Sequence, residues 1–433
     1  MNFDRMRALL LEQAIQGKLV PQLTTKPHRI LQIKREQEPV PFSIPEQWIW
    51  ISAKDAFQLL SGRDLVKSEI FDDLPEGVVY PYITGASQIE NSSVLINRWT
   101  RNCAVKSRKG DLLLTCKGTV GKTAFNTIGD MHIARQIMAL RPNREVIEPK
   151  YLKVFIDAIA DRLGKEAKSM IPGIDRKTLL NKLIPLPPLE EQSRIVTRLD
   201  EAFAEIDRAE KAYQELQTLS GVLRGQILQE AIQGKLVPQL DSEEAVEQIG
   251  DAPEDVPFAI PEKWKWTSMS SVVDVRDGTH DTPKYVEKGI PFVTSKNLKL
   301  GVIDFSTVRY ISQDDHKEFI KRSKVDEGDI LMAMIGTIGN ALIVPKGLPE
   351  FSIKNVALLK KKEDVEISFS YVLLVLKAFE QLMDKQSSGS VQKFVSLKYL
   401  RNMPFPVPPL KEQERIVNKV QELLKQVDAL SSK

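Results

Sequence analysis

The chain has 433 residues, of which 42% are hydrophobic, and a formal net charge of only +3. This length is sufficient for two or more domains with cores of their own, and the composition is not that of a disordered chain. Cys103 and Cys116 are too few for a disulfide framework, and the four histidines lack the paired spacing of a zinc site. No apolar run has the length of a signal peptide or a membrane-spanning helix, so we expect a cytoplasmic protein.

The chain begins with a segment that returns in its middle. Residues 14–23 are repeated without change as residues 231–240. After each copy and a variable spacer follow Pro41–Trp50 and Pro257–Trp266, which share the pattern Ile-Pro-Glu-x-Trp. A repeat of roughly 220 residues predicts two domains and excludes a solenoid of short repeats. We interpret residues 1–24 as an N-terminal helical segment.

Residues 25–187 and 241–408 are predicted to form the two domains, each mixed in structure and dominated by short strands. Runs of β-branched and aromatic residues such as Val78–Thr84 and Gly289–Thr294 indicate these strands. Residues 63–100 and 279–323 share little between the copies, which indicates a common scaffold that presents two different surfaces.

Two long helices are predicted at 188–240 and 409–433, and in each the apolar positions follow a Pro-Pro-Leu start and a Glu-Gln pair. Apolar residues recur at intervals of three and four, the spacing of a helix-packing seam. We expect the two helices to bury each other's stripe, with a break or kink at Ser220-Gly221. The seam residues are Val196, Leu199, Phe203, Ile206, Ala209, Tyr213, Leu216, Leu219 and Leu223, and then Val417, Val420, Leu424, Val427 and Leu430.

The second long helix stops at Lys433, before its distal half, and residues 3–23 resemble that missing half. We therefore expect the N-terminal helix to lie beside or after the C-terminal one, so that both chain ends meet. The predicted fold class is α+β: two strand-rich mixed domains separated by long antiparallel helices, in a circular arrangement with pseudo-twofold symmetry. The aligned positions are Met6, Arg7, Leu10 and Ala14 with Leu223, Arg224, Ile227 and Ala231.

Three repeated motifs carry a resemblance to a known family: the Leu-Pro-Pro-Leu-x-Glu-Gln-x-x-Ile-Val segment at 186–196 with its Val-initiated copy at 407–417, the Ile-Pro-Glu-x-Trp openings, and the Gln-Gly-Lys-Leu-Val-Pro-Gln copies. With these motifs the chain resembles the DNA specificity subunit of type I restriction–modification systems. The resemblance covers essentially the whole chain. It implies two target-recognition domains that each read one half of a bipartite asymmetric site in double-stranded DNA. It also implies that the helices set the spacing and seat two methyltransferase subunits.

The resemblance implies recognition without catalysis and no cofactor on this chain. S-adenosylmethionine would belong to the partner methyltransferase subunits, which methylate adenine. ATP and Mg²⁺ would belong to a partner restriction subunit, a translocating nuclease, if one is present.

Local charge is consistent with a DNA partner. Between Arg101 and Lys150 basic residues outnumber acidic ones by ten to four, whereas between Glu190 and Glu215 acidic residues prevail by eight to four. We therefore expect the first domain to face phosphates and the acidic helix to stand away from them. A helix of about 40 to 45 residues would be about 60 to 68 Å long, ample to hold two readers a DNA turn or more apart.

Candidate DNA-binding residues are basic or amide side chains in or beside predicted turns, where they could reach phosphates or base edges. The alternative for each is an ordinary solvated surface group. The candidates are Arg63, Lys117, Lys122, Arg135, Gln136, Lys168 and Arg176 in the first domain, and Arg276, His280, Lys284, Lys296, Asn297, Lys354, Asn355, Gln392 and Lys393 in the second.

Two other functions are weighed. An enzyme has one motif in its favour, Gly121-Lys122-Thr123, but a phosphate-binding loop requires glycine where this chain has Cys116. The Pro-Pro-Leu segments lack the aromatic residue of a methyltransferase loop, and Glu190, Glu191 and Glu412 are interpreted as first-turn residues favoured by the helix dipole. A helical scaffold that never touches DNA is the other alternative, and it predicts no salt-dependent DNA binding.

Overall fold

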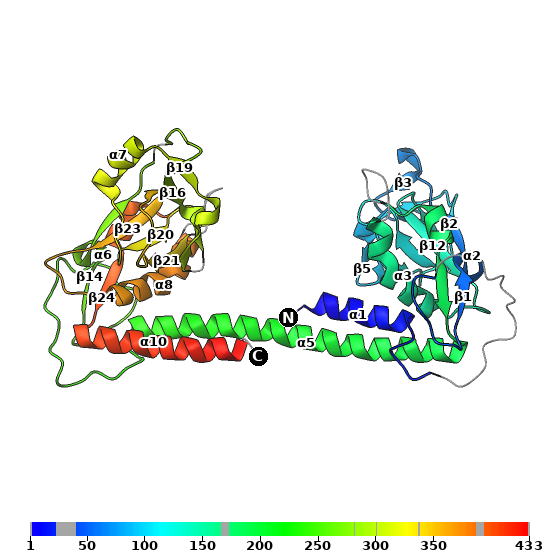
Figure 1. Cartoon of the computed structure of the whole chain (residues 1–433), viewed down its shortest axis with the longest axis horizontal. Coiled ribbons are helices and arrows are strands. Elements are labelled where there is room, and N and C mark those ends of the chain that lie inside the picture. The colour runs from blue at the N-terminus through cyan, green and yellow to red at the C-terminus, as the bar shows by residue number, and fades with distance from the viewer. Residues whose placement is uncertain are drawn as a thin grey trace. The chain divides into compact units, whose positions relative to one another are not determined.

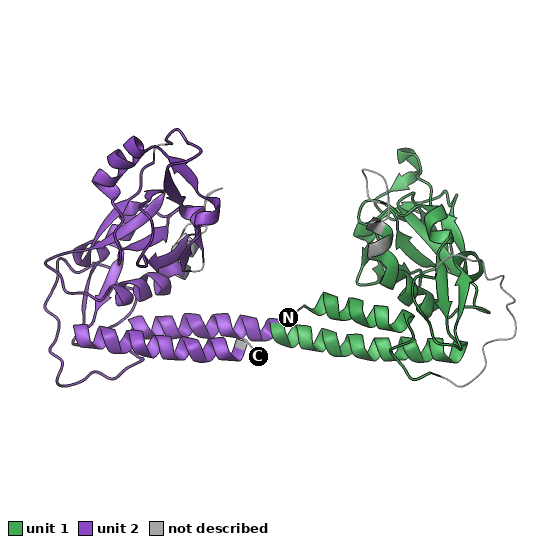
Figure 2. Ribbon diagram, viewed as in Figure 1, with its two compact units in different colours: residues 1–213 green, residues 214–433 purple. Residues whose placement is uncertain are grey.

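The computed structural model describes residues 2–22, 40–165, 173–280, 282–299, 301–336, 338–386 and 394–431. The chain forms two compact units, residues 1–213 and 214–433 (Figure 2). The boundary lies inside one helix, so the central helical segment expected as a separate part is divided between the units. No helix among the described residues is long and apolar enough to cross a membrane.

Unit 1 contains one helix at its start, a strand-rich body and the first part of the central helix (Figure 1). Its elements in order are α1 (Phe3–Ile15), β1 (Ile49–Ser52), α2 (Ala53–Ala56), β2 (Phe57–Ser61), η1 (Lys67–Glu69), β3 (Ile70–Phe71), β4 (Tyr80–Ile83), η2 (Ala86–Gln88), β5 (Ile89–Glu90), β6 (Ser93–Val94), β7 (Trp99–Thr100), β8 (Lys106–Ser107), β9 (Leu112–Thr115), β10 (Thr123–Phe125), β11 (Met131–Ile133), β12 (Ile137–Pro142), α3 (Pro149–Lys165), α4 (Arg176–Leu180), β13 (Leu183–Leu186) and α5 (Leu189–Ile232).

Unit 2 repeats this plan after the end of α5, with the additional helix α7 in its divergent part. Its elements are β14 (Lys265–Ser268), α6 (Met269–Val272), β15 (Val273–Asp277), β16 (Ile290–Thr294), η3 (Ser295–Asn297), β17 (Leu298–Lys299), β18 (Val302–Ile303), η4 (Phe305–Thr307), β19 (Arg309–Ile311), α7 (Gln313–Ser323), β20 (Ile330–Ala333), β21 (Gly339–Ile343), β22 (Ser352–Lys354), β23 (Val356–Lys361), α8 (Phe369–Gln386), α9 (Leu397–Asn402), β24 (Pro404–Val407) and α10 (Leu410–Ser431).

A four-stranded antiparallel sheet is the centre of each body, with strand order β10-β9-β12-β2 in unit 1 and β15-β23-β20-β21 in unit 2. Its central strands are buried on both faces, which explains why they are apolar without interruption. In β9, Leu112 and Leu114 face the core shared with the helices, whereas Leu113 faces a second core under the other sheet. The predicted mixed, strand-rich domains are therefore observed.

A second sheet covers the far side of each body. In unit 1 its order is β3-β7-β4-β11-β8, and in unit 2 it is β19-β16-β22. Each contains one parallel pair, β4 with β11 and β16 with β22. Because these pairs run in the same direction, their carboxyl ends meet at one edge of the body.

The helix pairing differs from the expected one. Val196 and Leu199 at the start of α5 belong to the same core as Ala14 and Ile15 of α1, and the ring of Phe3 lies 6.0 Å from that of Tyr213. In unit 2, α10 lies beside the last part of α5, where Arg224 pairs with Asp428. The seams at 196–206 and 417–427 therefore do not bury each other. Each packs on a copy of the distal helix, because α1 and residues 220–232 are those copies.

Burial follows the predicted seam only in part. Among the predicted positions, Val196, Leu199, Ile206, Val420 and Val427 are buried. The group of half-buried positions is Phe203, Tyr213, Leu216, Val417 and Leu424. Ala209, Leu219, Leu223 and Leu430 are exposed.

The central helix is continuous through Gly221, so the expected break is wrong. Gly221 is exposed and a Cβ there would meet nothing within 4 Å, so no packing conflict forces a kink at this residue. The helix does end before the predicted Leu240, at Ile232, and α1 ends at Ile15.

A glycine in the left-handed region ends both helices. Gly17 has φ +71° and Gly234 has φ +70°. In each copy the amide of this glycine and the amide after it donate to carbonyls three and five residues back, the Schellman pattern of a helix end. The identical decapeptide is thus a helix cap with its following turn.

Candidate nucleic-acid interface

The repeated motifs contact each other at the base of each body. We call this contact the lock: the helix-end glycine, Gly17 or Gly234, packs against the Ile-Pro-Glu-x-Trp opening, and the start of the long helix adjoins them. A Cβ on Gly17 would lie 2.5 Å from Cγ of Pro45, and one on Gly234 would lie 2.4 Å from Cγ of Pro261. The helix cap therefore packs directly on the Ile-Pro-Glu-x-Trp opening. In unit 1 the indole of Trp48 in this opening donates to Oε1 of Glu191 over 3.0 Å.

The Glu-Gln pair at each long-helix start lies in this lock. Glu191 and Glu412 are both in first turns, as expected, but both are fully buried, which the sequence did not indicate. Burial raises the pKa of Glu412, while the hydrogen bond that Nε2 of Gln239 donates to Oε2 of Glu412 over 3.4 Å acts in the opposite direction. Gln192 donates to the carbonyl of Pro187 and Gln413 to that of Pro408, both over 2.9 Å. These contacts fix each body on its helices.

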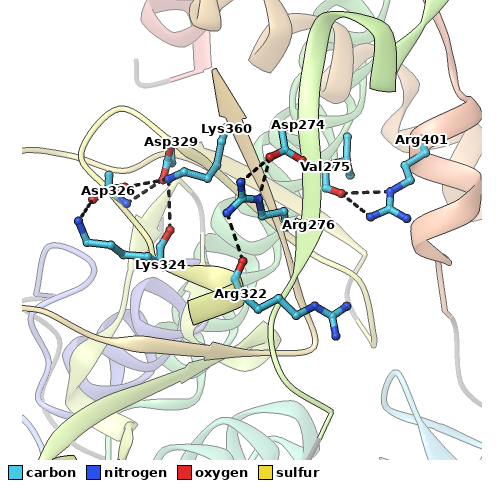
Figure 3. A network of polar contacts seen from close by, with 9 residues as sticks. All are labelled: Asp274, Val275, Arg276, Arg322, Lys324, Asp326, Asp329, Lys360 and Arg401. Atoms are coloured by element: carbon cyan, nitrogen blue, oxygen red, sulfur yellow. Dashed lines mark hydrogen bonds and ion pairs between the residues drawn. The ribbon is translucent and has the colours of Figure 1, made fainter. Parts of the chain in front are cut away.

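Each unit has an ion pair at the end of the central sheet where β9 or β20 begins. Asp111 precedes β9 and accepts from Nε and Nη2 of Arg141 at 2.9 and 2.8 Å. Asp329 precedes β20 and lies 2.5 Å from Nζ of Lys360. Lys360 also pairs with Asp326 at 2.9 Å, and the pKa of Asp326 is lowered by Lys324 and Lys360 (Figure 3). These pairs hold the turn in front of the central strand.

Four loops gather at the other end of the sheet, and we call this region the loop edge. In unit 1 it consists of residues 62–64, 84–88, 116–122 and 134–136, and in unit 2 of residues 278–280, 294–297, 335–336, 338–339 and 354–355. Register places them together, since β2 ends opposite the start of β12 and β9 ends there too. Hydrogen bonds across these loops, such as Gly62 to Ile137 and Gly278 to Val356, recur in both units.

The unit 1 loop edge contains several predicted cations, and most of them have a polar partner. Arg135 is exposed and its Nε lies 2.8 Å from Asp64. Lys122 donates to the carbonyls of Ala86 and Ile89 at 3.2 and 3.1 Å. Of the other predicted residues, the exposed Arg63, Lys117 and Gln136 also belong to this edge.

A buried histidine supports one of these loops. Nε2 of His132 lies 2.8 Å from the carbonyl of Arg63, and Nδ1 accepts from the amide of Val105 over 3.1 Å. These two contacts assign the proton to Nε2 of a neutral ring. Burial lowers the pKa of His132, in keeping with the neutral form.

The unit 2 loop edge is hollowed. A cavity of about 610 Å³ is lined by Tyr285, Phe292, Thr294, Ser295, Lys296, Asn297, Thr307, Arg309, Ile335, Gly336, Lys354 and Asn355. Among these lining residues none is acidic, and two aromatic rings and three cations contribute to the wall. A concave, cationic and aromatic surface suits a nucleotide.

The predicted unit 2 residues have different roles. Lys296 is exposed on the cavity wall, and Nζ of Lys354 lies 2.5 Å from the hydroxyl of Thr282. His280 contacts Oδ1 of Asn355 at 3.2 Å and Oδ2 of Asp277 at 2.8 Å. Asn297 is buried and its amide caps η3, bonding Thr294, Asp304 and Thr307. Those bonds shape the loop and leave the amide unavailable for a base.

Two predicted residues lie away from the loop edge. Nη1 of Arg176 donates to the carbonyl of Leu59 over 2.9 Å, so the side chain anchors α4 to β2. In unit 2 Arg401 makes the matching contact, to the carbonyl of Val275 in β15. Arg276 pairs with Asp274 and donates to the carbonyl of Arg322, within the network of Figure 3.

Three other predicted residues, Lys168, Gln392 and Lys393, lie outside the described residues. Lys284 is exposed in the segment before β16. The sequence did not single out Arg309 and Tyr285 of the cavity, because they lie in the divergent segment where no repeat marks them. For Arg309 the available signal is its place at the start of the short run 309–311, and no comparable local signal marks Tyr285.

Comparison with known proteins gives a consistent result. The family described as "Type I restriction modification DNA specificity domain" matches residues 45–218 and 261–433. The EcoAI specificity subunit of Escherichia coli is 24% identical over 99% of this chain and 90% of its own length. The EcoBI specificity subunit of Escherichia coli is 25% identical over 66% of this chain, a match that spans 62% of that relative.

Solved structures share the fold. One, described as "Structural basis underlying complex assembly and conformational transition of the type I R-M system", has a TM-score of 0.69 at 20% identity and covers 90% of this chain and 94% of its own. The crystal structure of the HsdS subunit from Thermoanaerobacter tengcongensis has a TM-score of 0.54 at 20% identity and covers 90% of this chain and 92% of its own. The resemblance noted in the sequence is thus confirmed: the chain belongs to the family of type I restriction–modification DNA specificity subunits and carries two copies of their specificity domain.

Proposed function

We propose that each unit reads one half of a bipartite, asymmetric site in double-stranded DNA through its loop edge. The observation that carries this proposal is the position of the basic and amide side chains. In both units they gather where the strands end, while the contacts shared by the copies lie at the lock and at the opposite end of the sheet. A common scaffold thus carries two different polar surfaces, as reading of two different half-sites requires.

The helices set the distance between the half-sites in this proposal. α5 has 44 residues, which corresponds to about 66 Å at 1.5 Å per residue, or nearly two DNA turns of about 34 Å. The two pairings of α5, with α1 and with α10, are consistent with the circular pseudo-twofold arrangement expected from the sequence.

The chain itself performs no catalysis in this proposal and binds no cofactor of its own. Two methyltransferase subunits dock on the helices and bring S-adenosylmethionine, and the product is methylated adenine. A restriction subunit with ATP and Mg²⁺ completes the complex where the cell encodes one. The assembly acts in the cytoplasm, where cellular DNA is accessible.

The test is methylation sequencing of DNA from cells that express this chain with and without its neighbouring methyltransferase gene. A bipartite adenine-methylated motif that requires both proteins supports the proposal and gives both half-sites. Absence of any motif, together with copurification of the two proteins and no salt-dependent DNA binding by their complex, supports the helical scaffold instead.

A matched pair of variants tests the loop edge. Arg135 and Lys150 are both exposed cations that pair with an aspartate, Asp64 and Asp200 respectively, but only Arg135 lies on the loop edge. We expect Arg135→Ala to weaken DNA binding by the assembled complex and to reduce the salt slope by about one. Lys150→Ala retains wild-type binding. Equal effects of the two changes would contradict a reading surface at the loop edge.

A further inference from the structure

Arg309 lies in the unit 2 cavity in an arrangement that differs from that of Arg135 in unit 1. Its guanidinium carbon lies 4.6 Å from the ring centroid of Tyr285, a cation–π contact. Among the described residues it has no ion pair, whereas Arg135 is paired with Asp64. Its position is therefore determined by an aromatic face, and its charge is not offset by a carboxylate.

The backbone also fixes where Arg309 lies. In the antiparallel pair of β16 and β19, Arg309 is directly opposite Phe292, whose ring lies 6.4 Å from that of Tyr285. Phe292 is buried and Tyr285 is half-buried, so the platform under the guanidinium is part of the folded body. An arginine held in this way loses little side-chain freedom when it binds a ligand.

Stacking occupies the face of a guanidinium and leaves its edge of N–H donors available. That edge matches two adjacent acceptors, either O6 and N7 of guanine or two oxygens of a phosphate. Guanine is the better match here for two reasons. Lys296 and Lys354 already supply point charges that suit phosphates, and the cavity beside Arg309 has room for a base edge.

We propose that Arg309, positioned by Tyr285, determines specificity in the second half-site by reading the paired acceptors of one guanine. This inference rests on the proposed DNA-recognition function and assigns one residue of the site to one class of base. Tyr285 acts through Arg309 and is a positioning residue.

The experiment measures competition binding of the methyltransferase-bound complex to its own site and to versions with each base pair of the second half-site changed. For Arg309→Ala and Arg309→Lys we expect discrimination at one G·C pair to fall roughly 5- to 150-fold, the range for one bidentate contact. Lysine keeps the charge but lacks the fork, so it does not restore discrimination. Binding to the site already changed at that pair stays near wild type.

Two further variants complete the design. Tyr285→Ala lowers discrimination at the same base pair, and Tyr285→Phe restores it, because the ring alone supports the guanidinium. Lys346→Ala is the matched loss of an exposed cation away from the cavity, beside Glu327, and it changes no base preference. Thermal unfolding of each variant is measured to confirm that unit 2 is folded.

The outcomes are distinguishable. Uniform weakening on every sequence in Arg309→Ala, with that affinity recovered in Arg309→Lys, shows a phosphate contact and overturns guanine reading. Base discrimination fully restored by Arg309→Lys overturns the role assigned to the guanidinium fork. Unchanged discrimination in a folded Arg309→Ala complex overturns any role in recognition. A wild-type complex without sequence preference refutes the proposed function itself, before any variant is considered.

Discussion

The two units have the same central sheet, lock and far-end ion pair, but their loop edges differ in chemistry. In unit 1 the cations mostly have partners, Arg135 with Asp64 and Lys122 with two carbonyls. In unit 2 a cationic and aromatic cavity occupies the same place. The loop edges can differ in this way because the contacts that hold the central sheet, the lock and the far-end ion pair, recur in both copies. Changes to the shared frame should therefore act alike in both units, and changes to the loop edges should not.

The largest expected effect is at the helix seam. Leu199 is 1% exposed, so Leu199→Asp places a charge in the core and should lower the free energy of unfolding by about 4 kcal/mol or more. Leu424 is half-buried, so Leu424→Asp should cost only about 1 to 2 kcal/mol. Chemical denaturation of the full chain measures both. Equal losses would show that the two seams are equally covered, contrary to the structure.

Replacing the lock glycine by alanine should lower the free energy of unfolding by the same amount in the two units. Gly17→Ala and Gly234→Ala each force a side chain into the left-handed region and against a proline, and we expect a loss of about 2 to 4 kcal/mol. Gly118→Ala and Gly336→Ala are the controls, because these glycines have φ +73° and +80° but nothing within 4 Å. They should show only the backbone cost, about 1 to 2 kcal/mol. A control as costly as its lock glycine would mean that contact with the proline is unimportant.

Changes to the ion pair at the far end of the sheet should lower stability and leave DNA recognition unchanged. Arg141→Met leaves the nearly buried Asp111 without its bidentate partner and should cost about 2 kcal/mol. Lys360→Met should act similarly through Asp329. Once folded, both variants should bind DNA as the wild type does, as measured by fluorescence anisotropy. Loss of DNA affinity without loss of stability would show that DNA contacts the end of the sheet that carries the ion pair, contrary to a reading surface at the loop edge.

The smallest effect concerns pH and only unit 1. The pKa of His132 is lowered in the folded protein, so the unfolded chain binds its proton first as the pH falls. The stability contributed by neutral His132 is complete above its ordinary pKa of 6.5 and is lost as the pH falls below that value. Unfolding measured between pH 5 and 8 should therefore show a slope that disappears in His132→Gln. Ser352 occupies the matching place in unit 2, so that unit lacks this contribution.

The sequence predicted the scaffold well because the scaffold is what the duplication repeats. Strands such as Leu112–Thr115 were evident from apolar runs between glycines, and the helix starts from Pro-Pro-Leu. The pairing of helices was predicted incorrectly because apolar spacing shows that a helix has a partner and does not show which one. The copied N-terminal segment indicated the correct partner, because its helix α1 is a copy of the distal part of α5, and each seam packs on one of these two copies.

The candidate site could be predicted only as a set of exposed polar residues near turns. Arg176 and Asn297 have the right residue type, but hydrogen bonds with the backbone commit them to the scaffold, and no local pattern distinguishes this. Arg309 is the opposite case: no repeated motif marks it, and the contact that positions it is with the ring of Tyr285, 24 positions earlier in the chain. Buried Glu191 and Glu412 likewise depend on contacts distant in sequence.

Gly221 lies where α5 has least cover, since residues 217–219 and 221–223 are exposed around a single buried serine. A glycine in a helix interior lowers local helix stability by about 1 kcal/mol relative to alanine, which is roughly a fivefold change in the opened population. Amide hydrogens of this stretch should therefore exchange with solvent fastest within α5. The helix that, as we propose, sets the distance between two half-sites is thus least stable at its middle.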